Sequence, residues 1–358
     1  MKKKWVFPVL IIFFILSAVG HYMEWSSLLQ FICSSIAILF VAAFLGKATE
    51  SVAHYAGQRL GGFLNATFGN AAELIIAIFL VKEGLFDMVK ASLTGAIIGN
   101  LLLVLGLSVL IGGLKFKEQR FNVQLAGHNA SLMLLAVIGL FVPAIFVTSE
   151  HLSPEKNEVL SLSVAGILIV SYILWLIFSM VTHKDMLADE KAAASEDEGT
   201  GEEETPEWSR NRSILYLMLA TVMTAFVSEW LVGTLHTFTT QFGLSELFVG
   251  AFLIAIVGNA AEHSAAVILA MKNKIGAAVE IAVGSSLQIA LFVAPALIFI
   301  SLFFGQPMDI VFTTIELVAI AVSVFIATSI SRDGRTNWYE GVLLLMVYVV
   351  LGTAFYLV

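Results

Sequence analysis

Residues 69–73 read GNAAE, from Gly69 to Glu73, and residues 258–262, from Gly258 to Glu262, read GNAAE again. Each copy lies inside a long apolar stretch, and the copies are 189 positions apart, counted from Gly69 to Gly258. Ionisable side chains inside a membrane are costly and rare, so a glutamate there indicates a functional site. Two such glutamates in duplicated surroundings predict an internally repeated membrane protein whose central site uses both copies, as in secondary transporters.

The composition independently indicates a membrane protein. The chain of 358 residues is 59% hydrophobic and only 13% charged, and its mean hydropathy is +0.92. Soluble domains contain about 25% charged residues. The net charge of −8 says little about partners, because much of it lies in one acidic segment. We expect no nucleic-acid partner. The single cysteine, Cys33, excludes an internal disulfide framework and a cysteine metal cluster.

Apolar runs of about 20 residues can cross a hydrocarbon core of roughly 30 Å. The basic start of the chain and the apolar run after it resemble a signal peptide, but no cleavage site follows, so we expect a retained helix. The second span is expected to continue as helix to about residue 57. The sequence predicts an all-α polytopic protein with eleven spans, at residues 5–22, 26–46, 62–81, 88–112, 123–147, 157–181, 213–240, 247–271, 275–303, 309–330 and 336–357.

The distribution of Lys and Arg predicts the orientation of these spans, because cytoplasmic connections are enriched in both residues. With the N-terminus in the cytoplasm and the C-terminus external, 15 of these residues lie inside, three lie outside, and Lys47 lies near a helix end. The external three are Lys82, Lys90 and Lys156. The cytoplasmic set is Lys2, Lys3, Lys4, Arg59, Lys115, Lys117, Arg120, Lys184, Lys191, Arg210, Arg212, Lys272, Lys274, Arg332 and Arg335.

Parity then predicts inverted repeats. The first motif lies on the third span and the second on the eighth, five crossings later, so the two helices run in opposite directions. One extra N-terminal helix (1–25) would precede a five-helix repeat (26–182), an acidic cytoplasmic linker (183–212) and a second five-helix repeat (213–358). An inverted pair places equivalent residues around an axis in the membrane plane, which brings both motifs to one site.

The motifs predict the chemistry of that site. Asn70 and Glu73 are three residues apart and so share a helix face, as do Asn259 and Glu262. Gly69 and Gly258 lower helix stability, and we expect unwinding at both to offer carbonyl groups to a cavity. Carboxylate, amide and carbonyl oxygens in a flexible set suit Ca²⁺ better than Mg²⁺. The ion would be bound transiently as a substrate, and no resident cofactor is predicted.

A second pair of segments contributes supporting residues. Asn100 lies near the middle of the fourth span, and Ser285 and Gln288 lie at the corresponding depth in the ninth. They are candidate ligands or hydrogen-bond partners of the glutamates, although such residues also serve as polar contacts between helices. His263, beside Glu262, is either a proton acceptor or a neutral hydrogen-bonded side chain. It also leaves zinc or manganese open as the ion.

These strings resemble a known family. Residues 64–74 (LNATFGNAAEL), 257–263 (VGNAAEH) and 283–291 (VGSSLQIAL) are similar to the two repeats of the calcium/proton exchangers, in the calcium/cation antiporter superfamily. The resemblance implies Ca²⁺ export against H⁺ by alternating access, with Glu73 and Glu262 as carriers. It also implies that Glu50 and Glu229, at equivalent places on the second and seventh spans, line the access pathways.

The alternatives belong to the same or neighbouring classes. Sodium/calcium exchangers place Ser or Thr near the carboxylates, where this chain has Ala71, Ala72, Ala260 and Ala261; this favours protons over Na⁺ as the counter-ion. A Na⁺-coupled exchanger and a Mn²⁺ exchanger stay open, and a cation channel with acidic rings is less favoured. No Asp lies mid-span and no nucleophile–base set is present, so an enzyme is not expected. We predict location in the cell membrane and leave a homo-oligomer open.

Three further acidic features have simpler readings. Glu280, near the start of the ninth span, attracts cations at the inner mouth or complements the helix dipole. Glu316 is placed mid-span on the tenth helix, where it should face protein or water. Residues 185–207 contain ten acidic residues and one lysine, a composition typical of a solvated linker.

Overall fold

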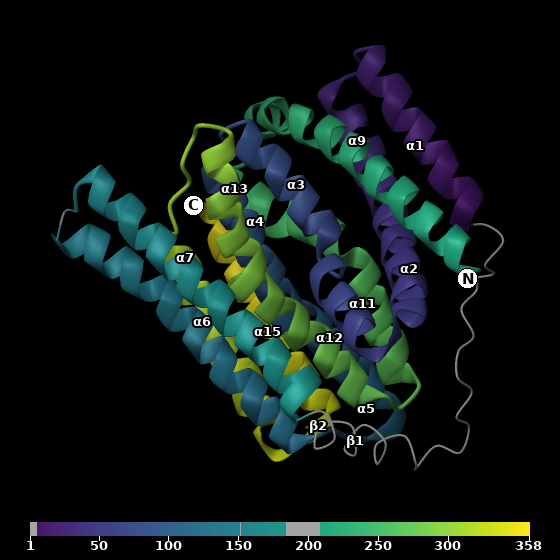
Figure 1. Ribbon diagram of the computed structural model, residues 1–358, viewed down its shortest axis with the longest axis vertical. Coiled ribbons are helices and arrows are strands. Elements are labelled where there is room, and N and C mark those ends of the chain that lie inside the picture. Colours follow the sequence, from purple (N-terminus) through teal and green to yellow (C-terminus); the bar gives the residue numbers. More distant parts are fainter. Residues whose placement is uncertain (1–5, 151, 184–207) are drawn as a thin grey trace. The chain divides into compact units, whose positions relative to one another are not determined.

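The computed structural model describes residues 6–150, 152–183 and 208–358, and helices make up most of these ranges (Figure 1). Within them, nine helices are long and apolar enough to cross a membrane, and α1 (Val6–Tyr22) is a shorter apolar helix. The all-α polytopic class predicted from the sequence is confirmed. Most of the predicted acidic linker lies outside the described residues.

The helices follow the predicted spans closely. The third predicted span is divided between the end of α2 and the whole of α3. The bounds are α2 Ser27–Phe68, α3 Ala71–Lys82, α4 Phe86–Ile98, η1 Gly99–Val104, α5 Leu105–Phe116, α6 Val123–Glu150, α7 Pro154–Ile177, η2 Phe178–Thr182, α9 Arg210–Phe242, α10 Glu246–Phe248, η3 Val249–Ile254, α11 Ala255–Met271, α12 Ile275–Gln288, η4 Ile289–Val293, α13 Ala294–Phe303, α14 Thr314–Ile330, η5 Ser331–Asp333 and α15 Trp338–Leu357.

The chain forms two compact units, each built from both halves of the sequence. The first contains Met1–Ser92, Pro206–Ala261 and Phe355–Val358, and the second contains Leu93–Thr205 and Glu262–Ala354. The predicted five-helix repeats divide the chain by sequence symmetry and not by compactness, so they do not coincide with these units. The division into repeats stays a prediction.

In the first unit, α2 packs against α1 and α9 (Figure 1). A buried polar network joins α1 to α2: the Ser17 and Ser34 hydroxyl oxygens are 2.8 Å apart, and Gln30 donates to the Ser17 carbonyl at 3.0 Å. Helix α2 bends at Gly57, whose φ of 80° and ψ of 171° are available to glycine without a Cβ clash. The bend separates the second predicted span from the start of the third.

In the second unit, three connections between spans lie side by side. Lys115 donates to the Met271 carbonyl at 2.8 Å, and Gln119 donates to the Ala270 carbonyl at 3.0 Å. Strand β1 (Glu118–Arg120) pairs antiparallel with β2 (Arg335–Asn337). All three connections were predicted to be cytoplasmic, so their association agrees with the predicted parity, while the assignment of that face to the cytoplasm stays a prediction.

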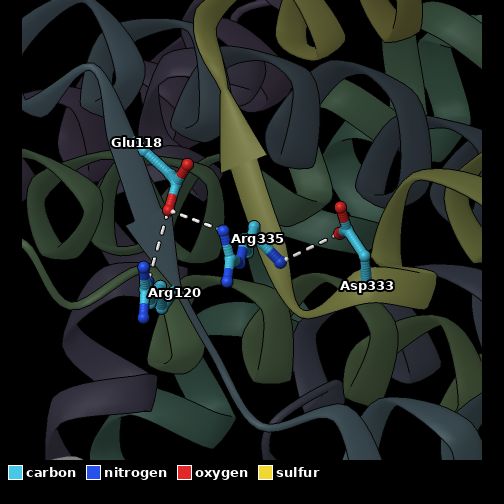
Figure 2. Close-up of polar contacts among 4 residues, drawn as sticks. All are labelled: Glu118, Arg120, Asp333 and Arg335. Carbon is cyan, nitrogen blue, oxygen red and sulfur yellow. Dashed lines mark hydrogen bonds and ion pairs between the residues drawn. The ribbon is translucent and has the colours of Figure 1, made fainter.

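Charged side chains surround this small sheet (Figure 2). Glu118 Oε1 lies 3.3 Å from Arg120 Nε and 3.6 Å from Arg335 Nη1, and the Arg335 backbone N–H donates to Asp333 at 3.0 Å. The pairs are half-exposed, and such ion pairs each contribute about 1 kcal/mol or less. The sheet therefore depends mainly on its backbone pairing and on the buried Gln119.

The expected position of Glu316 was wrong. Helix α14 begins at Thr314, five residues after the predicted start, so Glu316 lies in its first turn and not mid-span. The Thr313 hydroxyl accepts from the Glu316 backbone N–H at 3.3 Å, and the Glu316 carboxylate accepts from the Thr313 backbone N–H at 2.8 Å. This reciprocal arrangement is a capping box, which satisfies N–H groups at a helix start. Glu316 therefore has a structural role at a helix end.

Candidate cation site

The first motif lies at a break between two helices. Helix α2 ends at Phe68, Gly69 and Asn70 form a turn, and α3 begins at Ala71. Glu73 lies in the first turn of α3 and is partly buried, whereas Asn70 is only 2% exposed. The last carbonyl groups of a helix have no partner within that helix. The unwinding expected at Gly69 is therefore present as a two-residue interruption between α2 and α3.

The second motif lies within a continuous helix, so the unwinding expected at Gly258 does not occur. Helix α11 runs from Ala255 to Met271 through Gly258, Asn259 and Glu262. The departure from α-helical geometry in this span occurs earlier, in the π-helical segment η3 (Val249–Ile254). Gly258 has a different role, which its surroundings in the first unit explain.

The absence of a side chain at Gly258 lets α11 approach Glu73. A Cβ at Gly258 would lie 3.5 Å from Cγ of Glu73, 3.7 Å from its Oε1 and 3.8 Å from Cδ1 of Ile76. All of these residues belong to the first unit. Gly258 of the second motif therefore lies beside Glu73 of the first motif within the first unit.

Asn259 offers a buried acceptor in the same unit. Its side chain is fully buried, and its Nδ2 donates to the Ala255 carbonyl at 3.0 Å. Among the described residues, none donates a hydrogen bond to its Oδ1. Buried polar atoms usually have a partner, and an acceptor oxygen with no donor is suited to a cation.

The second unit holds Glu262 and all four supporting residues. The Ser285 hydroxyl donates a hydrogen bond to the Glu262 carboxylate, which is partly buried, and Oε2 of Glu262 has no partner within the described residues. The predicted association of Ser285 with the glutamate is thus present in the geometry. For His263, also partly buried, the described part of the chain provides no partner for Nε2.

Asn100 and Gln288 lie where the helices change geometry. Asn100 is 1% exposed on the π-helical segment η1, and neither of its amide atoms has a partner in the described ranges. Gln288 is the last residue of α12, directly before the π-helical segment η4. A π-helical turn is often found at functional sites. The paired occurrence in two corresponding spans was not predicted from the sequence.

The three predicted pathway residues are placed as follows. Glu50 is exposed on α2, and Glu280 is partly buried in the second turn of α12. Glu229 is on α9, where its Oε1 lies 3.4 Å from the Lys82 Nζ. Sequence reasoning missed Lys82 as a partner, because the two residues are 147 positions apart and no motif joins them.

Comparison with known proteins identifies the family. The model of the family described as "Sodium/calcium exchanger protein" matches residues 26–181 and 212–357. The chain belongs to the sodium/calcium exchanger family. It is 48% identical over 343 residues to the Ca²⁺/H⁺ antiporter ChaA of Bacillus subtilis, covering 96% of each protein. It is 46% identical to a Ca²⁺/H⁺ antiporter of Aphanothece halophytica, covering 99% of this chain and 97% of that protein.

A solved structure agrees with the fold over the whole chain. The structure of native YfkE superposes with a TM-score of 0.85 at 42% sequence identity, covering 99% of this chain and 100% of that one. The resemblance stated from the motifs is confirmed at the level of the family. The helices that carry the two motifs are therefore part of an exchanger fold.

In this exchanger, the approach of Gly258 to Glu73 gives a direct prediction. Gly258→Ala should insert normally, because contacts of 3.5–3.8 Å are ordinary van der Waals distances. The methyl group would nevertheless occupy space beside the Glu73 carboxylate. We expect the apparent affinity for the transported cation to fall by roughly tenfold, equivalent to about 1.4 kcal/mol.

The measurement is the initial rate of transport against cation concentration in vesicles. The matched control is Gly46→Ala on α2, where an added Cβ meets nothing within 4 Å. An unchanged affinity in Gly258→Ala would mean that the space beside Glu73 is not used by the ion.

Proposed function

We propose that this protein is a Ca²⁺/H⁺ antiporter that exports Ca²⁺ in exchange for protons, by alternating access around a site containing Glu73 and Glu262. The observation that carries the proposal is the close approach of Gly258 to Glu73, where an added Cβ would lie 3.5 Å from Cγ of Glu73. Glu262 follows Gly258 by one helical turn on α11. The names of the relatives, which are Ca²⁺/H⁺ antiporters, support the same conclusion.

The donor set supports a hard divalent cation. Two carboxylates neutralise its charge, and the amide oxygens of Asn70 and Asn259, with carbonyl groups at the helix break, supply neutral ligands. Six to eight oxygens in a flexible arrangement are typical of Ca²⁺. Asn100 and Gln288 are further candidate ligands, whereas Ser285 holds the Glu262 carboxylate.

The residues around the glutamates support protons as the counter-ion. Ala71 and Ala72 precede Glu73, and Ala260 and Ala261 precede Glu262. Alanine offers no hydroxyl oxygen to replace the hydration shell of Na⁺. The carboxylates themselves are left as the groups that bind either Ca²⁺ or protons.

Charge balance gives the mechanism. An ionised carboxylate is disfavoured in surroundings of low dielectric constant, and a nearby positive charge favours it. The carrier should therefore reorient between the two faces when the two glutamates hold Ca²⁺ or are protonated. It should not reorient when they are empty and ionised. This restriction couples the two fluxes. Each pH unit across the membrane supplies about 1.4 kcal/mol per proton.

The decisive experiment is Ca²⁺ flux in proteoliposomes with an imposed pH gradient. We expect Ca²⁺ uptake to saturate with Ca²⁺ concentration and to depend on the pH gradient. Because protons leave the lumen as Ca²⁺ enters, uptake should make the lumen more alkaline. Gradients of Na⁺ or K⁺ at equal pH are the controls, and Mn²⁺ as competitor tests the alternative cation. Flux that follows Na⁺ and ignores pH would overturn proton coupling, and flux that does not saturate would indicate a channel.

A further inference from the structure

The ion pair between Lys82 and Glu229 connects the helix of the first motif to α9. Lys82 Nζ lies 3.4 Å from Glu229 Oε1, and the side chains are 46% and 48% exposed. Lys82 Nζ also lies 5.5 Å from the centre of the Phe79 ring, a cation–π contact that holds the ammonium group over α3. Both partners belong to the first unit, in which α3 packs against α9.

The position of this pair along α3 relates it to the candidate site. Glu73 lies in the first turn of α3, and Lys82 is its last residue. Nine residues at 1.5 Å each separate them by about 13.5 Å along the helix axis. Charged side chains that are half-exposed on membrane-spanning helices need water, because lipid does not solvate them. Water therefore reaches one end of the helix whose other end carries Glu73.

We infer that Lys82 is a tethered cation that weakens Ca²⁺ binding by Glu229 at this end of the pathway, and so promotes release of Ca²⁺. The inference rests on the proposed function. The Lys82 ammonium group pairs with the Glu229 carboxylate. An outgoing divalent cation would otherwise meet this carboxylate about 13.5 Å from Glu73, measured along α3. The lysine distribution assigns Lys82 to the external face, where an exporter must bind Ca²⁺ weakly.

The competing explanation is that the pair only fastens α3 to α9. Charge and fastening are separable by three variants. Lys82→Gln removes one positive charge, Glu229→Gln removes one negative charge, and the double variant restores the local net charge while leaving no ion pair. If Lys82 acts as a tethered cation, the two single variants should change the external-face affinity for Ca²⁺ in opposite directions, and the double variant should restore it. If the ion pair only fastens α3 to α9, all three variants should change this affinity in the same way, because each of them removes the pair.

The experiment measures apparent Ca²⁺ affinity separately on each face of the membrane. Right-side-out vesicles with an acidic lumen load Ca²⁺ at the external face, and everted vesicles with an acidic lumen load it at the cytoplasmic face. We expect Lys82→Gln to lower the external-face Michaelis constant for Ca²⁺ roughly three- to tenfold, from the Coulomb term in water reduced by salt screening. Glu229→Gln should raise it, the double variant should return it near the wild-type value, and Lys82→Arg should leave it unchanged.

Lys156→Gln is the matched control, because it removes another exposed lysine assigned to the external face. Its Michaelis constants should equal those of the wild type. A wild type without proton-driven Ca²⁺ uptake in either vesicle would overturn the proposed function. Three results would overturn the inference about Lys82 alone, provided that the wild type takes up Ca²⁺. The external-face Michaelis constant could be unchanged in Lys82→Gln, it could change equally in all three variants, or only the cytoplasmic-face constant could change.

Discussion

Glu73→Gln and Glu262→Gln are each expected to abolish Ca²⁺/H⁺ exchange, with at least a roughly hundredfold loss of flux. Glutamine has nearly the volume of glutamate, but it carries no negative charge and no exchangeable carboxyl proton. A divalent cation left with one carboxylate keeps one net positive charge, and an uncompensated charge in mid-membrane costs about 2.5–3.5 kcal/mol or more. Because about 1.4 kcal/mol is a factor of ten, flux should fall to background.

The measurement is initial Ca²⁺ uptake in proteoliposomes at equal amounts of inserted protein, checked by size-exclusion chromatography. Glu155→Gln is the control, because Glu155 is an exposed carboxylate in the first turn of α7 and outside both motifs. It should retain wild-type flux. Half or more of the wild-type flux in either motif variant would contradict the shared site.

The spans were predictable because hydropathy acts locally. Each apolar run of sufficient length forms a helix wherever it lies in the chain, and the observed bounds differ from most predicted ones by a few residues. The break at residues 69–70 was also predictable, because glycine weakens a helix and a mid-span glutamate requires polar surroundings. These features depend on neighbours within a few turns.

Features that depend on distant partners were not predicted. Strand β1 has only three residues and pairs with β2, so that Glu118 faces Asn337 across more than two hundred positions of sequence. Nothing in a three-residue segment indicates such a partner. The ion pair of Lys82 with Glu229 was missed for the same reason.

One of two errors had a local signal that the hydropathy argument outweighed. Thr313 and Glu316 have the spacing of a capping box, which marks a helix start, and that spacing would have moved Glu316 from mid-span to the first turn of α14. Gly258 was expected to unwind its helix because glycine lowers helix stability. In the structure, its missing side chain makes room for Glu73, a role that depends on packing between helices.

The second large effect concerns pH. If Ca²⁺ and protons use the same two carboxylates, acidifying the Ca²⁺-loading face should raise the apparent Michaelis constant for Ca²⁺ with little change in maximal rate. Both glutamates must lose their protons before they bind the ion, and the two sites titrate as a coupled pair. The constant should therefore rise by up to about a hundredfold per pH unit once both groups are protonated, because two competing protons each contribute a factor of ten.

The direction of this effect distinguishes a shared site from a separate proton path. If protons instead moved through His263 alone, the maximal rate would fall at pH values where the imidazole is in the wrong protonation state. The apparent affinity for Ca²⁺ would stay nearly constant. A shared site changes the affinity and spares the maximal rate at saturating Ca²⁺. The same competition requires that Ca²⁺ binding release protons from the loaded carrier.

The most direct test is the initial rate of Ca²⁺ uptake against Ca²⁺ concentration, at several pH values on the loading face with the opposite face held constant. A shared site of Glu73 and Glu262 predicts a Michaelis constant that rises as pH falls, with a slope that steepens toward two protons per Ca²⁺ and a nearly constant maximal rate. A Michaelis constant that stays unchanged across three pH units would contradict it.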